Sequence, residues 1–261
     1  MAKLLEFKNQ DGELLRGIVD EANSDRAVIF LHGFEGSTVR MRFKNIVDRL
    51  KDQAVSFRLD FAGAGISDGD FSKITVAKMV GELNSAIMAL KSNCTNIKNV
   101  SVVAHSLGAC VALKFNQENP DTLGKLILLA PGLNQQKLLR YFFVQSELKD
   151  QKIEWSNYEH YLDEAAFQNN CRLDHQMRKE HYLDSGYLSE NSEMDYQQFL
   201  QTAKPENILI IHGLSDEVVP MASNDKIPSN IRLLEVRDGN HDLARPDMVD
   251  QYLDEVIEFL K

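Results

Sequence analysis

The sequence predicts an α/β fold: a mostly parallel, doubly wound sheet with helices on both faces and one helical insertion. Short, continuous apolar runs alternate with amphipathic segments of helical length. Apolar runs of this kind are typical of strands buried on both faces of a parallel sheet. The alternation is interrupted once, by a long segment without a strand-like run. In such a fold, functional residues are expected at the carboxyl ends of the strands.

The first two strands are predicted to form a hairpin. Leu4–Lys8 and Leu14–Val19 flank a turn that contains Asp11 and Gly12, a dipeptide typical of hairpin turns. Six apolar runs predict the remaining strands: Ala27–Leu31, Val55–Leu59, Val100–Ala104, Leu126–Ala130, Ile208–Ile211 and Ile231–Val236. Four amphipathic segments predict the helices of the core: Thr38–Lys51, Ile74–Lys91, Leu107–Gln117 and Asp247–Leu260.

Residues 134–203 form the predicted insertion, and residues 1–133 and 204–261 the predicted core. The insertion is rich in aromatic residues and contains the only tryptophan, Trp155. Residues 141–200 hold 12 acidic and 5 basic side chains, so most of the formal net charge of −10 lies there. Because the insertion leaves the core directly after a strand, we expect a helical lid over the strand ends. The alternative is a set of surface helices that cover the sheet edge.

Composition restricts the class of protein. At 261 residues and 43% hydrophobic content, the chain can bury the core of one large domain, with or without an insertion. There is no apolar run long enough for a membrane span, and the charged, strand-like start does not resemble a signal peptide. The negative net charge argues against a nucleic-acid partner.

The cysteines indicate a reducing compartment. Cys94, Cys110 and Cys171 are odd in number and far apart, which favours free thiols and a cytoplasmic location. Neither cysteines nor histidines cluster with the spacing of a zinc site, so we expect no metal. A homodimer is possible, but nothing in the sequence determines the oligomeric state.

The candidate nucleophile is Ser106. It follows the strand-like run Val100–Ala104 and precedes an apolar helical segment, and small residues lie two positions away on either side, at Ala104 and Gly108. This pattern is typical of a nucleophile elbow, a strand-to-helix turn so sharp that large side chains at these two positions would clash. The common form is Gly-x-Ser-x-Gly, and Ala104 replaces the first glycine.

A serine nucleophile needs a base, an acid that orients the base, and donors for the negative oxygen, and residues of these types follow three more predicted strands. Asp216 is the candidate acid, with Glu217 and Asp242 as competitors. The candidate base is His241, which follows Gly239. The backbone amides of Phe34 and Leu107 are the candidate oxyanion donors, which such chemistry requires. The order Ser106, Asp216, His241 is the one that an α/β-hydrolase requires. His32, His105 and His212 are expected to support turns, and Asp60 to tie loops together.

These motifs resemble the α/β-hydrolase superfamily, and within it the cinnamoyl (feruloyl) esterase and carboxylesterase-like group. The similarity lies in His32-Gly33-Phe34, in the segment from Arg58 to Gly69, in Ala104-His105-Ser106-Leu107-Gly108 and in Gly239-Asn240-His241. A helical insertion before the acid loop is also shared. The resemblance implies a serine esterase without a cofactor, acting on small carboxylic esters that include aromatic, cinnamoyl-type ones.

Three classes of function are therefore open. The leading one is a serine hydrolase whose small-molecule ester substrate forms an acyl-enzyme on Ser106. The same residues would also serve a thioesterase, an amidase or a hydrolase of carbon–carbon bonds. The third is a non-catalytic homologue that binds a ligand without turnover. Substrate-binding residues are expected in residues 134–203, where two or three of the aromatic side chains would line the pocket. The aromatic candidates are Tyr141, Phe142, Phe143, Trp155, Tyr158, Tyr161, Phe167, Tyr182, Tyr187, Tyr196 and Phe199.

Overall fold

Eight strands form one mixed sheet in the computed structural model, which describes residues 2–173, 175–177 and 183–261. The strand order is β1-β2-β4-β3-β5-β6-β7-β8, with β1, β2 and β4 pairing antiparallel and all other neighbours parallel. The strands are β1 (Ala2–Lys8), β2 (Leu14–Asp20), β3 (Arg26–Leu31), β4 (Val55–Asp60), β5 (Asn99–His105), β6 (Leu126–Leu129), β7 (Ile208–Gly213) and β8 (Arg232–Val236). The predicted fold class and the N-terminal hairpin are confirmed.

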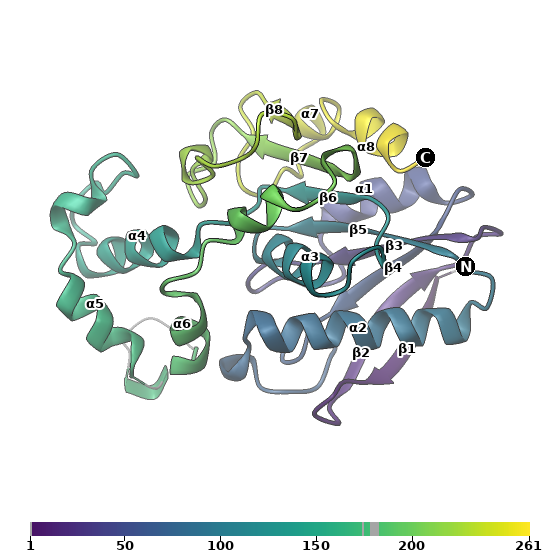
Figure 1. Ribbon diagram of the computed structural model, residues 1–261, viewed down its shortest axis with the longest axis horizontal. Helices are drawn as coiled ribbons and strands as arrows, with labels where there is room; N and C mark the ends of the chain where they lie inside the picture. Colours follow the sequence, from purple (N-terminus) through teal and green to yellow (C-terminus); the bar gives the residue numbers. More distant parts are fainter. Residues whose placement is uncertain (1, 174, 178–182) are drawn as a thin grey trace.

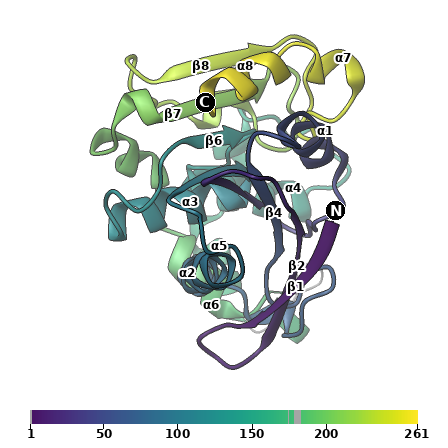
Figure 2. The same ribbon diagram turned by 90° about the vertical axis from the view of Figure 1, so that its right-hand side faces the viewer.

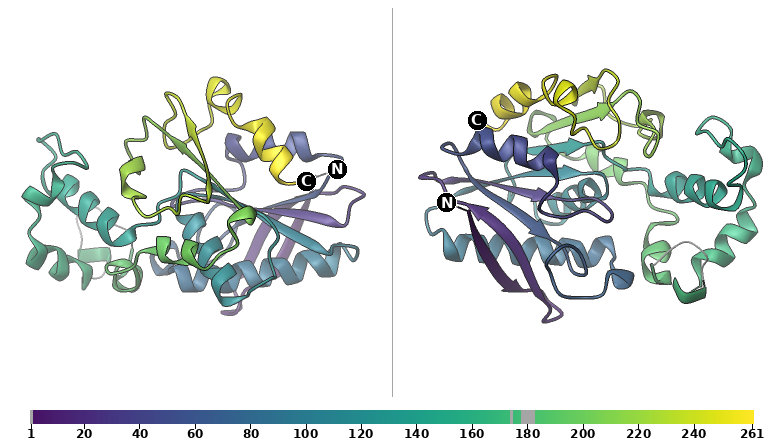
Figure 3. Two further views of the ribbon diagram at one scale, coloured as in Figure 1. Left: turned by 45° about the horizontal axis from the view of Figure 1, so that its top comes forward. Right: turned by 180° about the vertical axis from the view of Figure 1, so that it is seen from behind.

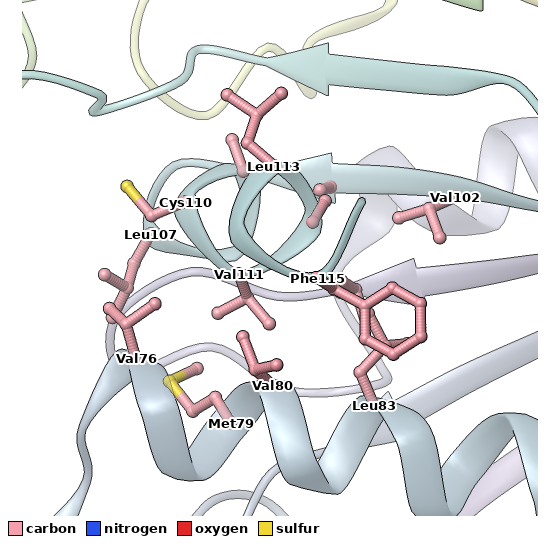
Figure 4. Packing of buried hydrophobic residues seen from close by; sticks show 14 of the residues in the cluster. Val76, Met79, Val80, Leu83, Val102, Leu107, Cys110, Val111, Leu113 and Phe115 are labelled. Atoms are coloured by element: carbon pink, nitrogen blue, oxygen red, sulfur yellow. The ribbon is translucent and has the colours of Figure 1, made fainter. Parts of the chain in front are cut away.

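Helices cover both faces of the sheet (Figures 1 and 2). On one face lie α1 (Met41–Leu50), α7 (Pro246–Val249) and α8 (Leu253–Phe259), and on the other α2 (Val76–Asn93) and α3 (Leu107–Glu118). Successive side chains of a strand point to opposite faces, so Phe30 packs with the α1 face and Ile29 with the α2 face. Figure 4 shows apolar side chains of α2 and α3 meeting in the core on the α2 face of the sheet.

Two predicted helices differ in extent. The helix expected from Thr38 begins only at Met41, because the backbone of Arg40 is extended, with φ −64° and ψ 131°. The amide of Thr38 donates to the Asp60 carboxylate at 2.6 Å, which ties the preceding loop to β4. The helix expected over Asp247–Leu260 is broken into α7 and α8. Between them Tyr252 is buried and its hydroxyl donates to the carbonyl oxygen of Leu243 at 2.8 Å, a tertiary contact that outweighs helical continuity.

The segment between β6 and β7 contains helices and, in its described residues, no strand. It extends from the end of the sheet at which β6 stops (Figures 1 and 3). Its α-helices are α4 (Gln135–Glu147), α5 (Glu164–Cys171) and α6 (Ser185–Asn191), and its short 3-10 helices Tyr158–Tyr161, His175–Met177 and Tyr196–Gln201. The short 3-10 helices in the described part of the core are Phe71–Lys73, Pro205–Asn207 and Met221–Ser223.

Hydrogen bonds attach this segment to the core. Both carboxylate oxygens of Glu190 in α6 accept from the first amides of α2, those of Val76 at 2.6 Å and Ala77 at 2.8 Å. The amide of Tyr196 donates to the carbonyl oxygen of Leu133 at 2.9 Å. No helix within the described ranges is long and apolar enough to cross a membrane.

Candidate active site

Ser106 occupies the turn between β5 and α3. Its backbone has φ 52° and ψ −117°, a left-handed conformation that is strained for a residue with a side chain. Its amide is held by the carbonyl oxygen of Leu129 in the neighbouring strand, at 3.0 Å. The strained turn is therefore fixed by the sheet, and it places the hydroxyl beyond the strand ends.

Two glycines allow the backbone to close around this turn. A Cβ atom at Gly108 would lie 2.8 Å from the carbonyl oxygens of Leu31 and His32, so a larger residue would push α3 away from β3. A Cβ atom at Gly33 would lie 2.8 Å from Cβ of Ser106. The loop after β3 thus passes directly beside the serine, which is the reason for glycine in both motifs.

A chain of hydrogen bonds links Ser106 to two residues from other strand ends. Nε2 of His241 lies 3.0 Å from Oγ of Ser106, and Nδ1 of His241 lies 2.8 Å from Oδ2 of Asp216. A carboxylate only accepts, so Nδ1 carries the proton and Nε2 is free to accept from the hydroxyl. The structure brings together the three residues that the sequence predicted as nucleophile, base and acid.

Asp216 is buried and surrounded by donors. Its Oδ1 accepts from the amides of Val218 at 3.0 Å and Val219 at 2.8 Å. His212 Nε2 donates to the carbonyl oxygen of Val219 at 2.9 Å and lies 3.4 Å from Oδ2 of Asp216. Burial alone raises the pKa of Asp216, but the contacts with His212 and His241 outweigh it and the pKa lies below its usual value. The carboxylate is therefore ionised beneath the imidazole.

The loop that carries His241 is held from two sides. His105 Nε2 donates to the carbonyl oxygen of His241 at 2.8 Å, and burial, followed by the charge of Arg42, lowers the pKa of His105 well below its usual range. Arg42 binds both the carbonyl oxygen and the carboxylate of Asp242. Asp242 is thus engaged with an arginine, while Glu217 is exposed, so neither competes with Asp216 for the imidazole.

The other expected supporting residues also hold turns. His32 donates through Nδ1 to the carbonyl oxygen of Gly33 at 2.8 Å and accepts through Nε2 from the amide of Phe61 at 3.2 Å. Burial lowers the pKa of His32 to about 4, so it is neutral. Asp60 accepts from the amides of Thr38 and Ile66, which joins the loops after β3 and β4.

The predicted oxyanion donors border the same space as Ser106. Phe34 follows β3 and Leu107 begins α3, and both line the pocket that contains the serine. The amides of these two residues donate to no group in the described part of the chain. The amide of Leu107 belongs to a helix N-terminus, where backbone donors and the helix dipole favour negative charge.

A cavity of about 320 Å³ opens beside Ser106, and we call it the Ser106 pocket. One end contains Ser106, His241 and the loop after β3. The other end is mostly apolar and comes from α4, α5, α6 and the loop after β7. Its principal apolar residues are Leu138, Phe142, Phe143, Phe167, Leu188 and Val219. A pocket with apolar walls and few polar groups suits a small organic ligand.

A family model described as serine aminopeptidase, S33 (Hydrolase_4) matches residues 22–243, which include every residue of this site. The chain belongs to this family. It is an α/β-hydrolase, as the motifs indicated, and its mixed sheet with flanking helices has the architecture of that superfamily.

Relatives of this hydrolase include esterases. A Mycoplasma genitalium protein provisionally named esterase/lipase 3 is 32% identical over 130 residues, which span 49% of this chain and 44% of that protein. The chain therefore matches less than half the length of that relative. The structure of an esterase of Pyrococcus furiosus matches with a TM-score of 0.70 at 20% identity, and the match covers 100% of this chain and 90% of that chain. Est1E of Butyrivibrio proteoclasticus, solved with ferulic acid, has a TM-score of 0.67 at 21% identity, with 98% of this chain and 96% of that chain covered. At such identities the structural likeness shows the fold.

Some residues of the hydrolase site were predicted only as candidates, and others not at all. Four of the aromatic candidates line the pocket, Phe142, Phe143, Phe167 and Tyr187, whereas two or three were expected. The candidate Tyr182 lies outside the described residues. Arg40 and Arg42 also line the pocket, and His212 supports Asp216. The position of Arg42 in the segment after the Gly33 turn is a weak indication that it belongs to the site. No sequence pattern indicates which of the aromatic residues face the serine, because the packing of the insertion decides it.

Proposed function

We propose that this hydrolase cleaves carboxylic esters through an acyl-enzyme on Ser106. The observation that carries the proposal is the hydrogen-bonded chain from Asp216 through His241 to Ser106, at the end of an apolar pocket. A serine is a weak nucleophile unless a neighbouring base accepts its proton. Here the base has the required tautomer, and its orientation is fixed by a buried, ionised carboxylate.

The reaction proceeds in two halves. His241 Nε2 takes the proton of Ser106 Oγ as the oxygen attacks the ester carbon. The amides of Phe34 and Leu107 stabilise the negative oxygen that forms, and each such donor contributes about 3–4 kcal/mol in comparable sites. His241 then donates the proton to the departing alcohol, and the acyl group remains on Ser106. Water, activated by His241, releases the acid and regenerates the serine. No cofactor takes part in these steps.

We further propose that residues 134–203 act as a lid that selects the acyl group. The pocket walls from α4, α5 and α6 support an apolar acyl group, because they offer aliphatic and phenyl surfaces. Tyr187 is the one tyrosine among the four aromatic residues of the insertion that line the pocket, and its hydroxyl donates to Oε1 of Gln135 at 2.9 Å. This engagement favours aliphatic or plain aromatic acyl groups over phenolic, cinnamoyl-type ones.

The test combines labelling with turnover. A fluorophosphonate probe is expected to label the wild-type protein at Ser106, and p-nitrophenyl butyrate is expected to be hydrolysed faster than methyl ferulate or an acyl-CoA. Ser106→Ala should lose both labelling and nearly all hydrolysis while its circular dichroism spectrum is unchanged, because triad members supply several orders of magnitude in turnover. Labelling that persists in Ser106→Ala, or an unlabelled wild type, would show the proposal to be wrong.

A further inference from the structure

Arg42 lines the Ser106 pocket and has one nitrogen, Nη1, without a partner among the described residues. Only 4% of its side chain is exposed, and Nε donates to the carbonyl oxygen of Asp242 at 2.6 Å while Nη2 pairs with the carboxylate of the same residue. The third nitrogen, Nη1, donates to no described group, and it is not sealed inside the protein as Nε of Arg58 is. Because Arg42 lines the pocket, Nη1 is a fixed, charged donor that a ligand can reach.

Arg40 adds a second guanidinium to the same part of the pocket. Its side chain is exposed, lines the pocket and makes one hydrogen bond, from Nη2 to the carbonyl oxygen of Glu35 at 3.0 Å. It forms no ion pair with a carboxylate of the described residues. Arg40 contacts the main-chain carbonyl of Glu35 and not its carboxylate, so the positive charge of Arg40 can pair with a ligand.

Both arginines lie where a leaving group would depart. In the proposed reaction His241 gives its proton to the leaving oxygen, so that oxygen must come within hydrogen-bond reach of Nε2. Asp242 follows His241 directly, and Arg42 holds Asp242 through two of its nitrogens. A substituent on the leaving oxygen therefore passes close to the two guanidinium groups, while the apolar walls of α4 to α6 receive the acyl group.

We propose that the leaving-group half of the substrate carries a carboxylate, which binds Nη1 of Arg42 and the guanidinium of Arg40. This inference rests on the proposed esterase function. Guanidinium groups bind carboxylates through short, charge-assisted hydrogen bonds, and an arginine held in place loses little entropy on binding. Two acidic residues, Glu35 and Asp242, line the pocket beside the two arginines, so these four side chains carry no formal net charge. Because there is no excess positive charge, a ligand group with one negative charge fits here better than a phosphate dianion.

The test compares two chromogenic esters with the same acyl group. One is the hexanoate of 3-carboxy-4-nitrophenol, and the other carries a neutral carbamoyl group in place of the carboxylate. We measure the ratio of kcat/KM for the carboxylate over the carbamoyl ester. The wild type is expected to favour the carboxylate by about tenfold, equivalent to about 1.4 kcal/mol. The ratio should fall about tenfold in Arg40→Gln and be partly restored in Arg40→Lys.

Arg49→Gln is the matched control. Arg49 lies near the end of α1, the helix that follows Arg40. It is half-exposed, pairs with Asp254 and is not part of the pocket, so its loss removes one positive charge without changing the subsite. Its ratio should equal that of the wild type. A wild-type ratio of one or less, or an unchanged ratio in Arg40→Gln, overturns this inference and leaves the esterase proposal standing, since the carbamoyl ester is still cleaved. If neither ester is cleaved and Ser106 is not labelled, the esterase proposal fails and this inference fails with it.

Discussion

At the scale of single residues, Asp216 is held by more donors than a purely orienting carboxylate needs. Two backbone amides, His241 and His212 all surround it. His212 is itself fixed, because Nδ2 of the buried Asn224 lies 3.4 Å from its Nδ1. These partners stabilise the ionised form of Asp216 and fix the imidazole of His241. The loop after β7 therefore fixes both the position and the charge of Asp216, the proposed acid.

Asp216→Asn is expected to lower kcat by about 10⁴-fold and to leave substrate binding nearly unchanged. An amide can donate to Nδ1 of His241, which would place the proton on Nε2 and remove the acceptor for the Ser106 hydroxyl. Steady-state kinetics with p-nitrophenyl butyrate checks this, and Glu217→Gln is the control. Glu217 is adjacent and exposed, so that variant should retain activity within about twofold. A large loss in Glu217→Gln with little loss in Asp216→Asn would reverse the assignment.

Sequence reasoning at this scale works for residues in motifs and fails for residues brought in by packing. Ser106, Asp216 and His241 follow strand ends in a fixed order, so their meeting can be predicted, although their catalytic role stays a prediction. Arg42 joins the site through Asp242, 200 positions away. No local pattern encodes such a pair, because it depends on where α1 packs against the last loop.

At the scale of elements, Arg140 connects the parts of the insertion. Its guanidinium, with a side chain 12% exposed, binds Glu164 in α5 and Glu193 after α6, and it also donates to the carbonyl oxygen of Ser192. The guanidinium lies 4.6 Å from the ring centre of Phe167, a residue of the pocket wall. One side chain of α4 thus sets the positions of α5 and of the chain after α6.

Arg140→Met is expected to destabilise the protein by about 1–2 kcal/mol, which corresponds to a fall in Tm of about 2–8 °C. Methionine fills similar space but leaves both glutamates without their cation. The loss is moderate because the two carboxylates are largely exposed and regain water. Thermal unfolding measures it, with Arg172→Met, an exposed arginine of the same segment, as the control. Equal Tm values for the two variants would contradict a connecting role for Arg140.

Phe142→Ala is expected to change the preference between acyl groups. Phe142 lines the pocket, so its loss removes an apolar wall that a long acyl chain contacts and a short one does not. The ratio of kcat/KM for p-nitrophenyl hexanoate over the acetate should fall about tenfold, because a lost contact of about 1.4 kcal/mol acts on the long chain only. Tyr161→Ala, at an exposed aromatic residue that is not part of the pocket, should keep the ratio within about twofold. An unchanged ratio in Phe142→Ala would mean that the insertion only covers the sheet.

Elements of the core are predictable because periodicity encodes them, and those of the insertion are less so. Ile29 and Phe30 alternate between two cores, which is the pattern that their apolar run indicated. In the insertion, Glu190 meets the start of α2 across 114 positions. Contacts of this kind decide how α4, α5 and α6 are arranged, and they cannot be predicted from the pattern of neighbouring residues in the sequence.

At the scale of the whole molecule, a buried carboxyl group joins three parts of the fold. Glu82 of α2 is 1% exposed, and its oxygens accept from Nδ2 of Asn9 in the first hairpin and from the amide of Ala62 in the loop after β4, each at 3.1 Å. Burial raises the pKa of Glu82 to about 7, against the opposing effect of these hydrogen bonds. The native protein therefore binds a proton at Glu82 that the unfolded chain releases above a pH of about 4.5.

This difference makes the stability contributed by Glu82 decrease as the pH rises. Below about 4.5 both states hold the proton, and between about 4.5 and 7 only the native state does, so unfolding releases a proton and becomes easier with each step in pH. The loss amounts to about 3 kcal/mol by pH 8. Other carboxyl groups, such as Asp216 with its lowered pKa, act in the opposite direction. The effect of Glu82 is thus seen as a difference between variants rather than in the wild type alone.

Glu82→Gln is expected to become more stable relative to the wild type as the pH rises from 4.5 to 8, because glutamine keeps an acceptor for Ala62 without a proton to lose. Urea unfolding at a series of pH values gives the difference in the free energy of unfolding. The exposed Glu235→Gln removes the same charge from the surface and should give a difference that does not vary with pH. If the two variants show the same pH profile, Glu82 is ionised in the native protein, and its two hydrogen bonds rather than its burial decide its charge.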